Sequence, residues 1–223
     1  MLYLALSCLQ GRPIKLAAKE LLELGIRGLQ LTPGLVPDPD FKSWLARENI
    51  NYLIHHGFSW DKYNTAVWNE KADCLVTSNS IHPPILDSPP GKVWKKRAER
   101  GDYNNFFLET MYPKYHLGNE KELTWAMDNQ FKLAVDVSHI YIQQQSGSLS
   151  NSVWQRLQQY DRISELHLSV NNGSADLHQP LNKNSFGLDW VKERSQDIPV
   201  ILECYMHRLS HSERLAQIEL IKI

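Results

Sequence analysis

The chain has 223 residues, of which 42% are hydrophobic and 22% are charged. This composition supplies enough apolar side chains for a sizeable core and excludes a chain that is disordered throughout. Lys and Arg number 24 and Asp and Glu number 25, so the net charge of −1 excludes a strongly basic protein that coats nucleic acid.

Membrane and secretory signals are weak. No stretch approaches the ~20 consecutive apolar residues of a transmembrane helix, so we expect no membrane-spanning segment. The apolar run in residues 1–15 has no basic segment ahead of it, which favours a buried strand over a signal peptide. The three cysteines, Cys8, Cys74 and Cys204, are odd in number and far apart. A disulfide framework is therefore not expected, and a reducing cytoplasm is the expected compartment.

Short apolar runs recur at intervals of roughly 25 to 35 residues, and each has the length of a β-strand. They cover residues 2–7, 28–33, 52–57, 78–83, 105–110, 132–137, 165–170 and 199–204. Helix-like stretches lie between them, at residues 14–26, 41–49 with Asp40 as the expected cap, 118–130 and 153–163. Residues 85–104 are less regular, because two prolines and a glycine precede a charged helix-like run.

Alternating strands and helices predict a parallel sheet covered by helices. Eight such units match a (β/α)8 TIM barrel, which typically needs ~250 residues, so we predict a single compact barrel domain over residues 1–223. An open doubly wound sheet is the alternative. We favour the barrel because polar residues fall at the carboxyl end of run after run. The first turn, residues 10–13, is not a glycine-rich phosphate loop, which argues against a dinucleotide fold.

Imidazoles and carboxylates gather at or just beyond the ends of these runs. They are His55, His56, His82, Glu109, Asp136, His139, His167, Asp176, His178 and Glu203. In a barrel these positions converge at the carboxyl-terminal mouth, where barrel enzymes carry their active sites. Such ligands suit zinc, manganese or iron, and they exceed the four ligands of one tetrahedral ion. We therefore predict two or three metal ions, with Glu109 or Glu203 as a bridging ligand.

Each residue taken alone has a plainer interpretation as a hydrogen-bonded polar group or a helix cap. Successive strand residues face opposite ways, so only one of His55 and His56 need face the site, and the sequence leaves the choice open. We interpret three further histidines, which lie beyond the strand ends, as surface or outer supporting residues; they are His116, His207 and His211.

Four of these segments resemble one known family. Residues 165–193 (ELHLSVNNGSADLHQPLNKNSFGLDWVKE) resemble a His-Leu-Ser-Asp-Asn-Asn-Gly segment that continues to Asp-x-His and Asp-Trp. Residues 135–139 (VDVSH) resemble a Leu-Asp-x-x-His strand, and residues 108–110 and 200–203 resemble two strands that end in Glu. The family is the xylose isomerase-like barrel superfamily, which includes endonuclease IV and sugar phosphate isomerases and epimerases.

The resemblance implies roles for the ligand-type residues. Those that match the four-ligand core of the isomerases are Glu109, Asp136, His167 and Glu203. Those that match the extra ligands of the trinuclear endonuclease IV type are His55 or His56, His82, His139, Asp176 and His178. It implies phosphoester hydrolysis first and sugar (phosphate) isomerisation or epimerisation second, with Glu109 and Glu203 as catalytic residues. The chain departs from the family pattern at Val170, Thr110 and residues 183–184.

Two other classes stay open. Residues 136–142 and 176–180 also resemble multinuclear non-haem iron oxidative enzymes that modify cysteine-containing peptides, although these more often carry Asn where this chain has His139. A metal-binding barrel without catalysis is the remaining alternative, and Val170 and the altered turn at 183–184 support it.

The substrate class is set only loosely. We expect a small sugar or phosphoester, and the net charge does not favour nucleic acid. One basic stretch either meets phosphates at the mouth or forms a solvated helix face; it contains Lys92, Lys95, Lys96, Arg97 and Arg100 around Trp94. Several aromatic residues either stack a sugar or base or pack the loops; they are Phe58, Trp60, Tyr63, Tyr112 and Tyr115.

Overall fold

The structure is a computed structural model and describes residues 1–61 and 78–222. Its strands are β1 (Leu2–Ala5), β2 (Gly28–Leu31), β3 (Asn51–Ile54), β4 (Ser80–Ile81), β5 (Phe107–Glu109), β6 (Leu133–Asp136), β7 (Ile163–Leu168) and β8 (Val200–Leu202). All eight predicted runs therefore overlap a strand, although β3 and β7 begin one and two residues before their runs. Most strands are shorter than predicted, because each run continues past its strand into the loop that carries the polar residues.

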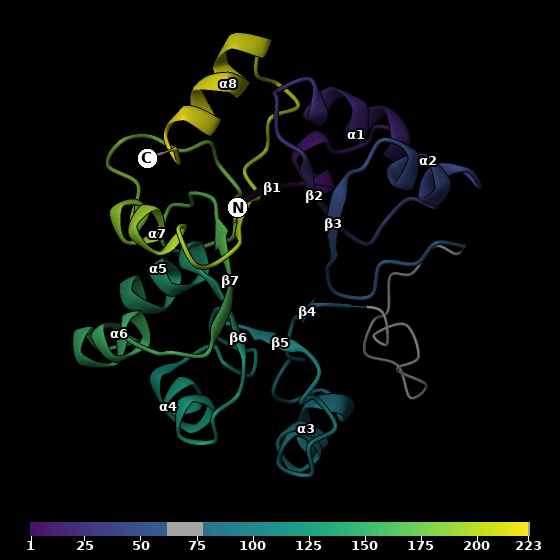
Figure 1. The fold of residues 1–223 in the computed structure, drawn as a ribbon. Coiled ribbons are helices and arrows are strands. Elements are labelled where there is room, and N and C mark those ends of the chain that lie inside the picture. Colours follow the sequence, from purple (N-terminus) through teal and green to yellow (C-terminus); the bar gives the residue numbers. More distant parts are fainter. Residues whose placement is uncertain (62–77, 223) are drawn as a thin grey trace.

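The strands form one parallel sheet in the order β3-β2-β1-β8-β7-β6-β5-β4. The two end strands meet through a parallel bridge between His55 and Ser80, and the N–H of His56 donates to the Ser80 carbonyl at 2.8 Å. The sheet thus closes into the predicted (β/α)8 barrel (Figure 1), and the open doubly wound alternative is wrong.

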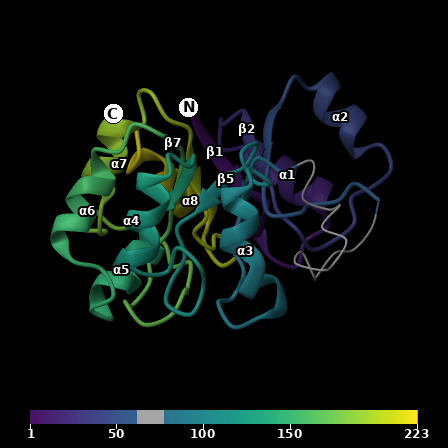
Figure 2. The ribbon, with the colours of Figure 1, turned by 90° about the horizontal axis from the view of Figure 1, so that it is seen from below.

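The helices lie around the ring of strands (Figures 1 and 2). They are η1 (Leu6–Leu9, a 3-10 turn), α1 (Ile14–Leu22), α2 (Phe41–Arg47), α3 (Pro89–Glu99), α4 (Glu120–Asp128), α5 (Val137–Gln145), α6 (Asn151–Gln158), α7 (Leu188–Arg194) and α8 (His211–Glu219). The four predicted helices are present with shorter bounds, and the irregular segment 85–104 contains α3.

Two helix starts differ from the sequence expectation. The Asp40 side chain makes no capping hydrogen bond to α2, because its carboxylate pairs with Lys15 Nζ at 2.5 Å. The helix α5, which the sequence did not predict, begins directly after β6. Its start is set by Asp136, whose Oδ1 accepts hydrogen bonds from the N–H groups of Ser138 and His139 at 2.7 and 3.0 Å.

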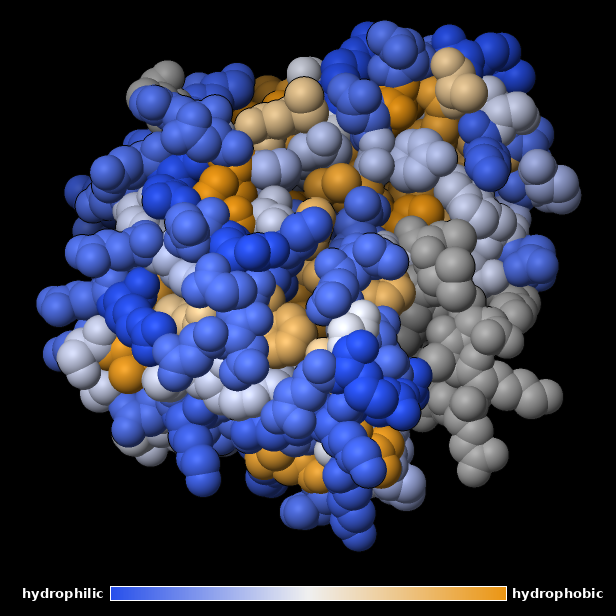
Figure 3. Space-filling model, turned by 60° about the horizontal axis from the view of Figure 1, so that its bottom comes forward, coloured by the Kyte–Doolittle hydropathy of each residue, from blue (hydrophilic) through white to orange (hydrophobic). Residues whose placement is uncertain are grey.

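The strands are mostly buried, as expected for a parallel sheet with both faces covered. Polar groups nevertheless enter the barrel interior, since Gln30, Glu165 and His167 are all 0% exposed and lie against one another. Figure 3 shows one face on which hydrophilic residues predominate and apolar residues form separate patches. Among the described residues, no helix is long and apolar enough to cross a bilayer.

Candidate metal centre

Glu109 occupies the middle of the barrel mouth. It ends β5 and is 1% exposed. Its Oε1 lies 3.3 Å from His82 Nε2 and 3.5 Å from His139 Nδ1. Its Oε2 lies 3.3 Å from His167 Nδ1 and 3.7 Å from His55 Nε2. One buried carboxylate therefore faces four imidazoles that come from four different strand ends.

Asp136 is fixed by the same turn that begins α5. Because its Oδ1 caps the helix, the carboxylate cannot rotate freely, and Oδ2 lies 3.7 Å from His139 Nδ1. His139 belongs to the first turn of α5 and is buried, with Nδ1 also 2.9 Å from the carbonyl oxygen of Thr110. The strand-to-helix junction thus sets the positions of two candidate ligands together.

The loop after β7 folds back over the mouth, as the sequence requires if its Asp-x-His pair is to reach the site. Val170 and Gln179 pair in an antiparallel bridge that turns the loop around. Asp176 Oδ2 then lies 3.2 Å from His139 Nε2 and 3.1 Å from His178 Nε2. These three residues form the outer edge of the cluster.

Glu203 lies directly after β8 and contacts the same His167 nitrogen as Glu109 does. Its Oε1 is 3.2 Å from His167 Nδ1. Burial, together with the negative charges of Glu109 and Asp136, raises the pKa of Glu203 to about 7, although His167 acts in the opposite direction. The four residues that match the isomerase core are therefore all buried at one mouth.

Three overlapping donor groups result. In each group the donor atoms lie within 4.8 Å of one another, and the groups are His55–Glu109–His167, Glu109–Asp136–His139 and Asp136–His167–Glu203. Glu109, Asp136 and His167 each belong to two groups. Shared ligands of this kind suit adjacent ions better than a single isolated ion.

Buried nitrogen and oxygen atoms that lack a hydrogen bond indicate whether these residues could bind a metal ion. Five buried atoms of the cluster form no hydrogen bond of good geometry within the described part of the chain, and the first three have ion-pair contacts in its place: Glu109 Oε2, Asp136 Oδ2, His167 Nδ1, Asp176 Oδ1 and His178 Nδ1. Leaving buried polar atoms without partners is costly, and native proteins rarely concentrate them. Coordination of divalent cations would satisfy these atoms, so the donor set fits the predicted metals.

The charges of the cluster are strongly coupled. Burial alone lowers the pKa of His139, but the carboxylates of Asp136 and Asp176 outweigh it and raise that pKa to about 10. His178 follows the same pattern beside Asp176, and its pKa is about 9. His55 has the reverse balance, because burial and neighbouring imidazoles hold its pKa well below the ordinary value. The protons on His139 and His178 occupy the place that cations would take.

The structure separates His55 from His56. His55 Nε2 faces Glu109 and lies 2.9 Å from His82 Nε2, while its Nδ1 lies 3.0 Å from Ser80 Oγ. His56 has a left-handed backbone (φ 44°), and its Nδ1 accepts a hydrogen bond from the His82 N–H at 3.0 Å. Its ring stacks on that of His82, with centroids 4.1 Å apart. His55 is therefore the member of the pair that reaches the Glu109 carboxylate.

His116 is a buried residue, which excludes the surface position that is one half of the sequence interpretation. It is 5% exposed and its ring stacks on Trp94, with centroids 4.8 Å apart. Its two ring nitrogens face Glu122 Oε2 at 2.9 Å and the Gly91 carbonyl oxygen at 2.8 Å. This histidine holds the packing of α3 against α4.

The basic stretch on α3 favours the second of the two interpretations given above, a solvated helix face. Lys95 Nζ pairs with Glu122 Oε1 at 2.8 Å, and Arg97 and Arg100 both pair with Asp102. Trp94 is 0% exposed. These charges form ion pairs within the helical layer, which favours a solvated helix face over a phosphate-binding surface.

The aromatic residues divide into two sets. Phe58 and Trp60 pack against each other with centroids 5.0 Å apart, and Trp60 also contacts Phe41 of α2, so this set packs loops. Tyr112 instead lies edge-on to the candidate ligand His139, with centroids 5.0 Å apart. The predicted Tyr63, like Cys74, lies outside the described residues.

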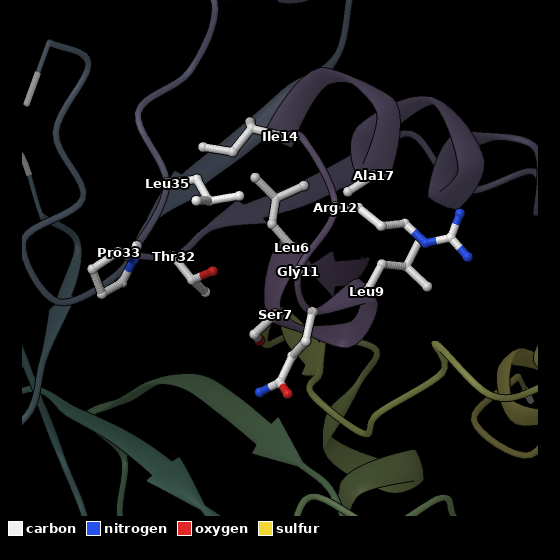
Figure 4. A pocket seen from close by; sticks show the side chains of 12 residues that line it. Leu6, Ser7, Leu9, Gly11, Arg12, Ile14, Ala17, Thr32, Pro33 and Leu35 are labelled. Atoms are coloured by element: carbon white, nitrogen blue, oxygen red, sulfur yellow. The ribbon is translucent and has the colours of Figure 1, made fainter. Parts of the chain in front are cut away.

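Two of the hollows in the described part of the chain lie beside the mouth. One of about 450 Å³ is lined by the candidate ligand His178 together with Tyr205, His207 and Arg208. The other, of about 350 Å³ (Figure 4), lies where β1 and β2 end and is lined by η1 and the 32–35 loop. Arg12 of this second hollow is paired with Glu20. The first hollow is therefore the better place for a substrate group next to the metals.

Glu165 and Gln30 are site residues that sequence reasoning missed. Glu165 Oε2 lies 3.1 Å from His167 Nε2, and Gln30 Nε2 lies 3.4 Å from the same nitrogen. The spacing of Glu165 two residues before His167 was the available signal, since such residues share a strand face. Nothing local in the sequence pointed to Gln30.

Comparison with solved structures gives the class of fold. A protein designated "Putative Xylose isomerase" from Rhodospirillum rubrum matches with a TM-score of 0.61 at 14% identity, covering 99% of this chain and 96% of that one. A xylose isomerase domain-containing protein from Salmonella typhimurium matches with a TM-score of 0.60 at 13% identity, covering 98% and 94%. This chain therefore has the fold of the xylose isomerase-like barrels, as its motifs predicted.

A third neighbour is the TTHB071 protein from Thermus thermophilus, from a crystal soaked with zinc chloride. It matches with a TM-score of 0.54 at 15% identity, covering 99% of this chain and 96% of that one. No protein-family model and no curated protein matches the sequence. At these identities the likeness establishes the fold, and the chemistry must be argued from the site.

Proposed function

We propose that this protein is a divalent-metal-dependent phosphoester hydrolase with two or three ions of zinc, manganese or iron at the barrel mouth. The observation that carries the proposal is the overlap of three donor groups through Glu109, Asp136 and His167. A chain of shared ligands suits a multinuclear centre, and multinuclear centres are suited to phosphoester displacement because both the attacking and the leaving oxygen need stabilisation.

Bound ions would polarise the phosphoester and make a water molecule more acidic. The residues of the chain supply the rest. Glu109 and Glu203 are the proposed catalytic residues, because both are buried carboxylates at the mouth and both contact His167. The organic part of the ester would occupy the hollow beside His178, whose lining includes Tyr205 and Arg208.

Sugar or sugar phosphate isomerisation is the second candidate. Two structural neighbours carry names that refer to xylose isomerase. The four residues that match the isomerase core lie together, and Glu109 and Glu203 both contact His167. In this reaction the two glutamates would transfer the substrate proton, and the outer residues Asp176 and His178 would be dispensable.

Metal analysis followed by turnover tests the proposal. The protein is purified without chelator, its metal content is measured, and bis(p-nitrophenyl) phosphate is offered with zinc, manganese or iron. Aldose–ketose interconversion is assayed in parallel on the same preparation. We expect two or three bound ions and phosphodiester turnover that disappears with chelator and returns with metal.

Matched variants separate catalysis from folding. Glu203→Gln should abolish turnover, whereas Glu122→Gln, which alters a buried glutamate in the helical layer, should retain it. Aldose–ketose turnover without phosphodiester turnover would replace the hydrolase with the isomerase. Oxygen consumption with iron and a cysteine-containing peptide would favour the oxidative class, and bound metal with no turnover in any assay would favour a non-catalytic barrel.

The expected partner is accordingly a small phosphoester or sugar, and the paired charges on α3 give no support to a nucleic-acid surface. The described cysteines, Cys8 and Cys204, are buried free thiols, which supports the proposed location in a reducing cytoplasm.

A further inference from the structure

Glu165 is a fully buried carboxylate directly behind the metal centre. It lies on β7 two residues before His167, so both side chains project from the same face of the strand. Both residues are 0% exposed. Burying a carboxylate without a partner is strongly unfavourable, and its contact with the His167 ring therefore needs to be a strong one.

The two nitrogens of the His167 ring face different surroundings. Nε2 lies 3.1 Å from Glu165 Oε2. Nδ1 lies 3.2 Å from Glu203 Oε1 and 3.3 Å from Glu109 Oε2, at the mouth. A neutral imidazole carries its hydrogen on one nitrogen and a lone pair on the other. When a cation takes up the carboxylates of Glu109 and Glu203, the Nδ1 lone pair would face that cation, and the hydrogen would remain on Nε2 beside Glu165.

Gln30 can strengthen the same preference. Its amide lies next to His167 Nε2, and its Oε1 makes no hydrogen bond with the described residues. The oxygen and nitrogen of an amide have nearly the same shape, so turning the group over places Oε1 beside the ring N–H. His167 Nε2 would then face two acceptors, and Nδ1 would face only the candidate metal site.

We propose that Glu165 is a positioning residue that holds His167 in the Nε2–H tautomer and thereby presents Nδ1 to the metal. The inference rests on the proposed metal centre but not on the reaction carried out there. Histidine ligands whose second nitrogen donates to a carboxylate are better oriented and more basic ligands. Glu165 would then act on metal affinity without contacting metal or substrate.

Substitutions that keep or remove the acceptor test the inference. Glu165→Leu keeps a side chain of broadly similar bulk but cannot accept a hydrogen bond, whereas Glu165→Gln keeps an acceptor oxygen. Glu122→Leu is the matched control, because it removes the carboxylate from the other buried histidine–glutamate pair, between α3 and α4. The apparent zinc Kd of each full-length protein is measured by competition with a chromophoric chelator.

We expect Glu165→Leu to weaken zinc binding by about 10- to 100-fold. Glu165→Gln should weaken it less, and Glu122→Leu should leave it unchanged even if the protein becomes less stable. Circular dichroism checks folding. Wild-type zinc affinity in folded Glu165→Leu would overturn the proposal.

Nitrogen NMR shows which ring nitrogen of His167 carries the hydrogen and which one binds the metal. A purely structural role of Glu165 would not determine this choice. In zinc-loaded wild-type protein labelled with 15N-histidine, long-range 1H–15N spectra should show His167 with a protonated Nε2 and a coordinated Nδ1. Coordination through Nε2 would overturn the proposal even if Glu165→Leu fails to fold. Wild-type protein that binds no zinc, manganese or iron would defeat the proposed metal centre and this inference together. Bound metal without hydrolysis would leave the inference standing.

Discussion

Among the residues that the structure describes, two buried clusters contain histidine and glutamate, and they differ in how far their polar atoms are paired. Between α3 and α4, both nitrogens of His116 face acceptors, and Glu122 contacts both His116 and Lys95. At the mouth, Glu109 faces four imidazoles, yet its Oε2 and several neighbouring atoms form no hydrogen bond with the described residues.

The difference in pairing distinguishes a cluster that supports the fold from a cluster that has polar atoms available for binding a metal ion. Residue types alone do not distinguish them, because each contains a buried carboxylate and at least one imidazole. In the helical cluster the ring nitrogens of His116 and the carboxylate of Glu122 all have partners, and Lys95 supplies a positive charge at 2.8 Å. At the mouth, imidazoles such as those of His139 and His178 are the partners of the carboxylates, and divalent ions would displace the protons of these rings.

The largest expected effect comes from removing the central charge of the mouth. Glu109→Gln and Glu203→Gln keep the side-chain size but lose a negative charge and one good ligand oxygen. We expect lower metal content and at least about a hundredfold loss of turnover, since even outer partners of ligands cost 10- to 100-fold. Elemental analysis and kinetics check this. Full metal and full turnover in Glu203→Gln would mean that the proposed mechanism is wrong.

Removing an outer ligand should have a smaller and more selective effect. His178 and Asp176 lie at the edge of the cluster, with side chains 20% and 19% exposed. His178→Ala should lose one metal ion and retain the others. The exposed His211 provides the control, because His211→Ala should keep the full metal content. Loss of all ions in His178→Ala would show that the outer and inner positions are not separable.

Metal binding should release protons. The pKa values of His139 and His178 are about 10 and 9 without metal, so both rings are protonated at pH 7.5. Ligand nitrogens must lose these protons, and metal affinity should rise with pH. Calorimetric titration in two buffers of different ionisation enthalpy measures the release. Identical heats in both buffers would contradict it.

The same two histidines, His139 and His178, should make the stability of the metal-free protein fall as the pH rises from neutral to alkaline. Their folded pKa values lie above the ordinary value of 6.5. Their contribution to the stability of the metal-free protein is therefore complete below about pH 6.5 and is lost as pH rises through 9 to 10. The metal-loaded protein should show a weaker decline over this range.

The smallest effect belongs to the helical cluster. Burial alone would raise the pKa of Glu122, but hydrogen bonds from His116 and Lys95 outweigh it and lower that pKa below 4.5. Its contribution to stability is present above about pH 4.5 and is lost as pH falls further. Glu122→Gln should cost about 1–2 kcal/mol at neutral pH and flatten this acid decline. Denaturant unfolding at several pH values measures both, and an unchanged acid profile would contradict the assignment.

The sequence by itself determined the barrel and most of the candidate ligands that gather at its mouth. Eight apolar runs separated by helix-like stretches leave few architectures, because strand and helix periods are local properties of the chain. Once the strands are parallel, residues at their carboxyl ends must share one mouth. The sequence therefore predicts that four ligand-type residues lie close together: Glu109, Asp136, His167 and Glu203.

Only the tertiary structure decided which nearby atoms meet. His55 rather than His56 reaches Glu109 because barrel closure pairs His55 with Ser80 and leaves His56 in a left-handed turn. The Asp40 side chain does not form the predicted helix cap, and its carboxylate pairs with Lys15, which is distant in sequence. Glu165 and Gln30 became site residues because two different strands place them behind one imidazole. Hydrogen bonds and charge interactions act between atoms a few ångströms apart, and sequence periodicity fixes the side of a strand but not those distances.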